Sequence, residues 1–302
     1  MQVVDEGISA PEEWYLSRGR IVGVMQEEAL RKAISSEEYK FKEVTLVDSM
    51  QRSEFWSEGL VELTNNAGDV VQCMVVKPNC PVKKGALFLH WLEPEAQNSN
   101  KTEFLPYARE IAKLGYISLL PDCFWSTTPE ESKRTRNWYQ WKTEVENDTL
   151  LIVKQTRELL TVNQYLRELS GLGQEEISMV AHDFGAMFGL MLTIYDLRFE
   201  KYALMACTPA FSDWFRFGSK LGEDELGEYV RKMDVFTPSY YIDRVAPSPV
   251  LLQFSTDDFY VPKEKALAYY ERAKEPKMLK WYDAGHGLNE QAIEDSKEWL
   301  VG

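Results

Sequence analysis

Asp183 lies where a run of apolar residues gives way to a tight turn of small residues. Residues 177–181 predict a buried strand, and the residues from Phe184 onward predict an apolar helix. A strand that turns directly into a helix strains the central residue, so only small neighbours such as Gly185 fit beside it. The helix N-terminus favours an anion there, which makes the Asp183 carboxylate a candidate nucleophile. A second interpretation is that Asp183 only caps this helix.

A candidate acid and a candidate histidine follow in the chain order that a hydrolytic triad on such a turn requires. Residues 249–254 predict a buried strand, and Asp258 lies in the polar loop after it. Its neighbour Asp257 is the competing candidate for the acid. Residues 279–282 predict the last strand, and the loop after it presents His286 between two glycines as the general base.

The chain has only three histidines, and the other two have simpler structural interpretations. His90 ends an apolar strand, so we expect it to bond to nearby backbone. His182 precedes the turn residue, and its side chain should point away from the nucleophile. We therefore expect His182 to support the core and His286 to do chemistry.

Residues 181–185, 258–262 and 285–287 together make the chain resemble the α/β-hydrolase superfamily over residues 58–302. In layout the chain is most similar to the dienelactone hydrolase-like branch, whose nucleophile is cysteine or serine. Aspartate at that position is instead known from haloalkane and haloacetate dehalogenases and from soluble epoxide hydrolases. The resemblance implies an α/β fold, with a mostly parallel, doubly wound sheet, helices on both faces and short edge insertions rather than a large cap.

The order of the predicted elements agrees with that fold. Residues 1–40 predict an N-terminal helical extension, with helices around 11–17 and 24–35, and residues 41–302 predict one hydrolase domain. Helices and strands alternate after an expected antiparallel pair at 60–63 and 70–76, which specifies a parallel sheet covered on both faces. The expected strands are 86–90, 117–120, 177–181, 202–207, 249–254 and 279–282, and the expected helices are 104–114, 143–169, 184–195, 263–273 and 290–300.

Two aromatic-rich insertions, residues 123–141 and 209–241, are expected at the edge of the sheet that carries the site. Aromatic residues in such loops fill cores more often than they contact substrate, but their density indicates an apolar pocket. The candidate pocket residues are Trp125, Tyr139, Trp214 and Tyr240.

An aspartate nucleophile limits the kinds of substrate that the protein can hydrolyse through a stable ester. Attack on an alkyl halide or epoxide carbon gives an ordinary ester on Asp183, which water activated by His286 can cleave, whereas attack on an acyl carbon gives an anhydride. Cleavage needs an oxyanion hole, which we expect from the backbone N–H of Phe184 and that of Trp91 or Leu92. The expected substrate is small, neutral and apolar, with water as co-substrate and no cofactor or metal.

Several positions depart from the families with an aspartate nucleophile. Phe184 stands where haloalkane dehalogenases have a halide-binding tryptophan, so a halide would need Trp91, Trp125 or Trp214. No arginine follows Asp183, which disfavours an anionic substrate. The tyrosines that could act as acids on an epoxide are Tyr139, Tyr240 and Tyr241, and Glu93 could place a second carboxylate near the site.

The composition excludes some classes of partner. A formal net charge of −14 argues against nucleic acid and anionic membrane surfaces. The four cysteines have no zinc-ligand spacing, and no apolar run is long enough to span a membrane. We expect a cytoplasmic protein, with a homodimer as its candidate assembly. Two other functions remain open: an esterase or lactonase with Asp183 as a base for water, and a non-catalytic binding protein.

Overall fold

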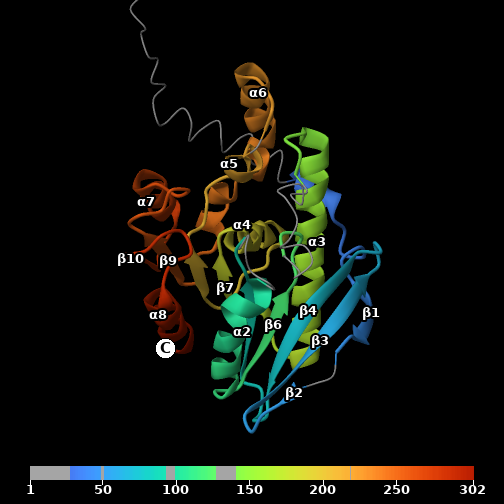
Figure 1. The fold of residues 1–302 in the computed structure, drawn as a ribbon. Helices are drawn as coiled ribbons and strands as arrows, with labels where there is room; N and C mark the ends of the chain where they lie inside the picture. Colours follow the sequence, from blue (N-terminus) through green and yellow to red (C-terminus); the bar gives the residue numbers. More distant parts are fainter. Residues whose placement is uncertain (1–27, 49–50, 93–98, 127–140, 218) are drawn as a thin grey trace, which may run out of the picture.

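A computed structural model describes residues 28–48, 51–92, 99–126, 141–217 and 219–302 (Figure 1). Residues 28–33 are helical, and Leu30 and Ile34 are buried against the main core. The helix expected around residues 11–17 lies outside the described residues.

The structure is a ten-stranded sheet with helices on both faces. The strands are β1 (Phe41–Leu46), β2 (Gln51–Arg52), β3 (Trp56–Asn65), β4 (Val70–Pro78), β5 (Lys84–Leu89), β6 (Tyr116–Pro121), β7 (Ile177–His182), β8 (Tyr202–Met205), β9 (Val250–Ser255) and β10 (Lys277–Tyr282). The α-helices are α2 (Ser99–Ala112), α3 (Val145–Ser170), α4 (Phe184–Met191), α5 (Phe211–Phe215), α6 (Glu223–Met233), α7 (Lys263–Arg272) and α8 (Glu290–Val301). Short 3-10 helices lie at η2 (Gln174–Glu176), η3 (Leu192–Tyr195), η4 (Asp234–Phe236), η5 (Pro238–Tyr240) and η6 (Ile242–Arg244).

The strands run in the order β1-β3-β4-β6-β5-β7-β8-β9-β10, with β2 paired to β3. Pairing from β6 through β10 is parallel, and β1, β3 and β4 form an antiparallel edge. This confirms the mostly parallel, doubly wound sheet expected from the sequence. The strand β1 was not predicted, because five of its six side chains are exposed and its apolar residues, Phe41, Val44 and Leu46, do not alternate regularly.

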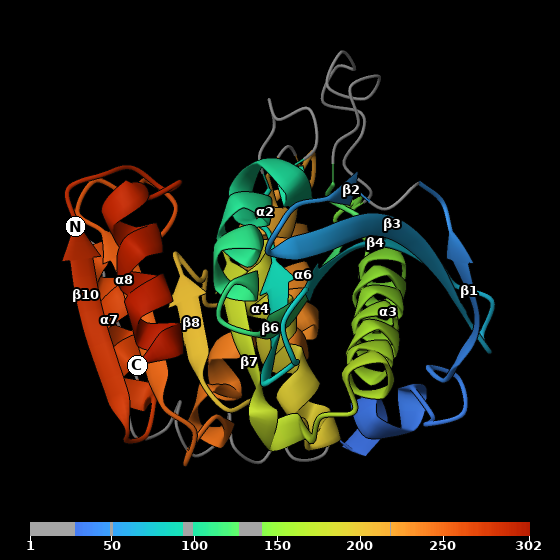
Figure 2. The ribbon, with the colours of Figure 1, turned by 90° about the horizontal axis from the view of Figure 1, so that it is seen from below.

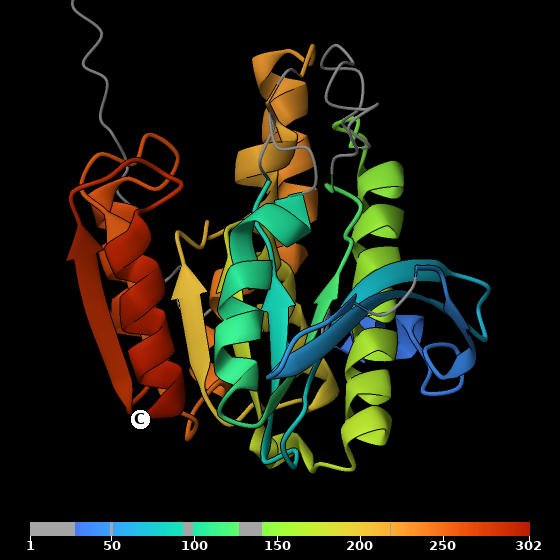
Figure 3. The same ribbon diagram turned by 60° about the horizontal axis from the view of Figure 1, so that its bottom comes forward.

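Two apolar clusters cover the two faces of the sheet. One contains buried residues of α2 and α8, which lie on the same face of the sheet in Figure 3. The other contains residues of α3, α4 and α7, and the β3–β4 pair curves over α3 (Figure 2). The loops after β5, β7, β8, β9 and β10 therefore emerge at one edge of the sheet, because these strands are parallel.

The two predicted insertions differ in how much of them is described. Residues 127–140 of the first lie outside the described residues. The second carries α5 and α6, and α6 stands above the sheet in Figure 1. The described part of the second insertion brings Trp214 to the edge where β7 ends.

Candidate active site

Asp183 occupies a strained turn between β7 and α4. Its backbone angles, φ of 48° and ψ of −114°, lie outside the regions that residues other than glycine prefer. The turn packs so tightly that a Cβ at Gly185 would lie 2.1 Å from the carbonyl oxygen of Leu89. The side chain of Asp183 makes no capping hydrogen bond to α4. The capping interpretation is therefore wrong, and the turn has the geometry expected for a nucleophile.

The structure brings the three predicted triad residues together. The Nδ1 of His286 lies 2.8 Å from Oδ2 of Asp258, and its Nε2 lies 3.5 Å from Oδ1 of Asp183. The other oxygen of Asp258 accepts the backbone N–H groups of Tyr260 and Val261 at 2.8 and 2.9 Å. Asp258 is thus fixed by its own loop and orients the imidazole toward Asp183. Asp257, the competing acid, is exposed and has no such contact in the described structure.

The two carboxylates determine the charge of His286. Burial alone would lower the pKa of His286, but Asp183 and Asp258 together raise it to about 9. Burial likewise opposes ionisation of Asp258, but the hydrogen bond and charge of His286 and the two backbone N–H groups hold its pKa below the ordinary value. At neutral pH the free site therefore holds a protonated imidazole between two carboxylates.

This arrangement predicts a pH dependence of stability. The folded-state pKa of His286 is above its ordinary value of 6.5, so its stabilising contribution is complete below about pH 6.5 and is lost as the pH rises through about 9. The contribution is on the order of 3 kcal/mol. We expect the free energy of unfolding in urea to fall more between pH 6.5 and 9.5 for the wild type than for Asp183→Asn. Parallel curves for the two proteins would contradict this charge arrangement.

The Asp183 carboxylate is closed off from solvent by neighbouring side chains. Its exposed fraction is 0%, and its Oδ2 has no hydrogen-bond partner in the described structure. The hydroxyl of Thr208 lies 3.5 Å from Oδ1 and accepts the indole N–H of Trp214 at 2.9 Å. Oδ1 of Asp183 thus faces His286 and Thr208 at 3.5 Å each, without a hydrogen bond to His286, and Oδ2 has no partner in the described structure, as attack on a substrate would require.

A second pair of buried side chains supports the histidine loop. The Nδ1 of His182 lies 2.5 Å from Oε1 of Glu103 on α2, and its Nε2 donates to the backbone carbonyl of His286 at 3.1 Å. The Trp91 ring stacks on His182 at 5.2 Å, and a Cβ at Gly287 would meet that ring at 3.1 Å. His182 therefore supports the site through the backbone of His286. Neither Glu103 nor Thr208 was predicted, because each comes from an element distant in sequence from the motifs.

The oxyanion hole differs from the expectation at one position. The backbone N–H of Trp91 donates to Oε2 of Glu103 at 3.0 Å, so this amide is already occupied. The backbone N–H of Trp91 is therefore not available as an oxyanion-hole donor. Phe184 begins α4, where the first N–H groups have no intrahelical acceptor, and Leu92 is buried next to Trp91. Phe184 and Leu92 remain the candidate donors.

The predicted pocket residues fall in different places. Trp125 is fully buried, donates its indole N–H to the His90 carbonyl and stacks on Phe184 at 5.4 Å, so it is core rather than pocket wall. The hydroxyl of Tyr240 donates to Asp234, and no contact joins it to the triad in the described structure. Tyr139 lies outside the described residues, as does Glu93.

Trp214 is the predicted pocket residue that does reach the site. Its ring lies 5.6 Å from that of His286 and stacks on Tyr260 at 4.7 Å. It also lines a cavity of about 220 Å³ beside the triad, with Thr208 and Phe217. Arg216, Lys265 and Asp213 line the same cavity, and Asp213 pairs with Lys265 at 2.9 Å and with Arg216 at 3.9 Å. Its wall therefore combines aromatic surface with a paired set of charges. A substrate entering here would meet Trp214 and Thr208 before Asp183.

His90 has the structural role expected from the sequence. Its Nδ1 donates to the Trp91 carbonyl at 2.8 Å, and its Nε2 accepts the hydroxyl of Ser126 at 2.9 Å. Burial lowers the pKa of His90 to about 4, so the ring is neutral. Its hydrogen bonds tie the end of β5 to the loop after β6.

The described residues contain no cluster of three or more side chains suited to a metal ion. All four cysteines have free thiols. No helix in the described ranges combines the length and apolar character needed to cross a membrane.

Comparison with solved structures identifies the fold. The chain is similar to an acetyl xylan esterase from Paenibacillus sp. R4, with a TM-score of 0.69, 13% identity and coverage of 93% of each chain. It is similar to acetyl xylan esterase 1 from Thermoanaerobacterium sp. JW/SL YS485, with a TM-score of 0.65, 14% identity and coverage of 97% of this chain and 94% of that one. The α/β hydrolase GrgF from Penicillium sp. sh18 gives a TM-score of 0.53 at 15% identity, with coverage of 81% and 95%.

No protein-family model and no curated protein matches the sequence. At identities this low the structural likeness establishes architecture only. The chain has the α/β-hydrolase fold.

Proposed function

We propose that this protein is a hydrolase that opens a small, neutral carbon electrophile, an alkyl halide or an epoxide, through a covalent ester on Asp183. The observation that carries the proposal is the buried carboxylate of Asp183, strained at the turn, 3.5 Å from His286 and with one oxygen unpartnered. The proposal follows the chemistry of a carboxylate, which is already anionic and needs no base to attack carbon.

In the first step, Oδ2 of Asp183 attacks the carbon. A halide then leaves with the bonding electrons, or the epoxide oxygen keeps them and takes a proton from the protonated His286. The negative charge of Asp183 disappears in the ester. Because that charge helps to raise the pKa of His286 in the free site, ester formation lowers this pKa and favours the neutral imidazole. His286 can then take a proton from water as the water attacks the ester carbonyl.

In the second step, the developing charge on the ester carbonyl oxygen is stabilised by the backbone N–H groups of Phe184 and Leu92. Collapse of the intermediate breaks the bond to the substrate oxygen, which restores the Asp183 carboxylate and releases an alcohol. The products are an alcohol and halide ion from an alkyl halide, or a diol from an epoxide. Asp258 holds the imidazole in position in both steps.

Four candidate donors to a leaving halide or epoxide oxygen already have acceptors in the free site. Trp125 and Trp214, two of the indoles that could hold a halide, donate to His90 and Thr208. Tyr240 and Tyr241, two of the candidate acids, donate to Asp234 and to the Val235 carbonyl. Of these four groups, only Trp214 contacts the triad, through its ring against His286 and through its acceptor Thr208. Trp214 is therefore the candidate donor to the leaving group, once its N–H is released from Thr208.

The alternative function is an esterase or lactonase of dienelactone hydrolase-like type, in which Asp183 acts as a base for water. The names of the structural neighbours favour it, since two of them are acetyl xylan esterases. It requires a water between Asp183 and an acyl carbon and gives no covalent adduct. A third alternative is a non-catalytic binding protein. Such a function would not explain the alignment of Asp258, His286 and Asp183.

A single turnover in ¹⁸O-labelled water separates the two catalytic mechanisms. With enzyme in excess over a substrate from an alkyl halide and epoxide panel, the ester mechanism predicts unlabelled alcohol in the first turnover and one heavy oxygen in the peptide that contains Asp183. The base mechanism predicts label in the product and none in that peptide. Turnover of activated esters alone, with labelled acid, would overturn the proposal in favour of the esterase.

A further inference from the structure

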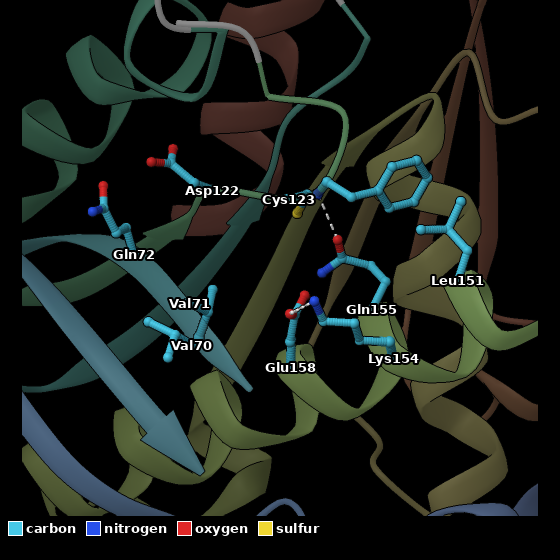
Figure 4. Close-up of a pocket in the computed structure, with 10 residues that line it drawn as sticks. Val70, Val71, Gln72, Asp122, Cys123, Leu151, Lys154, Gln155 and Glu158 are labelled. Carbon is cyan, nitrogen blue, oxygen red and sulfur yellow. Dashed lines mark hydrogen bonds and ion pairs between the residues drawn. The ribbon is translucent and has the colours of Figure 1, made fainter. Parts of the chain in front are cut away.

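A cavity of about 280 Å³ lies away from the triad, between α3, the start of β4 and the loop after β6 (Figure 4). One face of α3 lines it, because Leu151, Lys154, Gln155 and Glu158 recur at the spacing of helical turns. The opposite side is formed by residues 70–72 and 122–124. None of these residues belongs to the candidate active site.

Gln155 presents an unpaired donor to this cavity. Its side-chain oxygen accepts the backbone N–H of Phe124 at 2.7 Å, which fixes the orientation of the amide. Its nitrogen is buried and has no hydrogen-bond partner in the described structure, and Figure 4 shows it turned toward the side of Glu158. A buried N–H without an acceptor is costly, so the site favours a ligand that supplies one.

Glu158 presents an acceptor one helical turn further along. Its side chain is 9% exposed, and its one cationic neighbour within 4 Å in the described structure is Lys154, at 3.7 Å. Burial raises the pKa of Glu158 to about 7, which reflects a poorly solvated carboxyl group. A ligand N–H would replace the solvation that this carboxylate lacks.

Apolar side chains complete the cavity wall. Val71 is buried, and Phe124 and Leu151 are half-buried, all beside the polar pair. The cavity therefore combines the Gln155 donor and the Glu158 acceptor with an apolar surface, and Gln72, Asp122 and Lys154 add further polar groups to its lining.

We propose that this cavity binds a small neutral carboxamide. The ligand carbonyl accepts the side-chain N–H of Gln155, its N–H donates to the carboxylate of Glu158, and its apolar group packs on Phe124 and Leu151. A carboxylate ligand would be repelled by Glu158 and Asp122, and an ammonium ligand would leave Gln155 unpaired. The proposal is independent of the function of the triad.

The test uses benzamide as the probe in ligand-observed NMR titrations at about pH 8.5, where a Glu158 carboxyl with a pKa of about 7 is ionised. We expect a dissociation constant of ~1 mM, as is typical of a fragment of this size. Acetophenone lacks the N–H, and benzoate lacks it and carries a negative charge. Each should bind at least about tenfold more weakly, because it loses a buried hydrogen bond. Equal binding of the three probes, or no binding of benzamide, would overturn the proposal.

Two tryptophan substitutions on the same helix locate the site. Leu151→Trp places a larger ring in the cavity and should weaken benzamide binding at least ~10-fold. Leu150, next to it, is 64% exposed, so Leu150→Trp should bind benzamide as the wild type does. Equal effects of the two substitutions would place the probe elsewhere and contradict the proposal, while the comparison of the three probes needs no variant at all.

Discussion

Asp183→Asn is expected to reduce turnover of the substrate at least ~10³-fold, because the amide cannot supply the anionic oxygen that attacks carbon. Asparagine has nearly the same shape, so the turn, His286 and Thr208 should keep their positions. The amide also removes one of the two carboxylates that hold the proton on His286. The measurement is the rate of halide or diol release by the purified variant.

The neighbouring acids provide the matched control. Asp257→Asn should leave turnover close to that of the wild type, because Asp257 is exposed and does not contact His286. Asp258→Asn should reduce it, since Asp258 orients the imidazole from 2.8 Å. Retention of turnover by Asp183→Asn would exclude Asp183 as the nucleophile.

Gly185→Ala is expected to lower the free energy of unfolding by at least ~3 kcal/mol, or to prevent folding. The added Cβ would lie 2.1 Å from the carbonyl oxygen of Leu89 and 2.8 Å from that of His90. Both contacts are with backbone of the strand and loop beside the turn, so no side-chain rotation relieves them. Urea denaturation at a fixed pH measures the effect.

Gly227→Ala is the control for this substitution. Gly227 lies within α6, and a Cβ there would meet nothing within 4 Å. Alanine also has the higher helix propensity, so this variant should be as stable as the wild type or up to ~1 kcal/mol more stable. A Gly185→Ala protein as stable as Gly227→Ala would show that the turn does not depend on close packing against β5.

The sequence predicted the sheet and the triad because their signals are local. A buried strand followed by a small-residue turn placed Asp183, and glycine-flanked loops after strands placed His286, which the parallel sheet brings to one edge. The edge strand β1 has no such signal, because most of its side chains are exposed. Its pairing with β3 depends on the hydrogen-bonding edge rather than on an apolar pattern.

Groups that depend on tertiary packing could not be predicted. Glu103 comes from α2 and reaches both Trp91 and His182, so its effect on the oxyanion hole requires the packed helix. Trp125 and Trp214 lie in similar aromatic insertions, but only the second faces the triad. Composition indicates that such rings are buried and does not indicate which of them line a cavity.

The most direct test of the account is the mass of the His286→Gln protein after mixing with small alkyl halides and epoxides. Without the imidazole, water is not activated, so the ester should accumulate. The covalent mechanism predicts an increase in intact mass equal to the alkyl or hydroxyalkyl group less the one hydrogen that it replaces, mapped to the peptide that contains Asp183. An unmodified Asp183 in this variant, with wild-type protein that turns over the same compounds, would contradict the covalent mechanism.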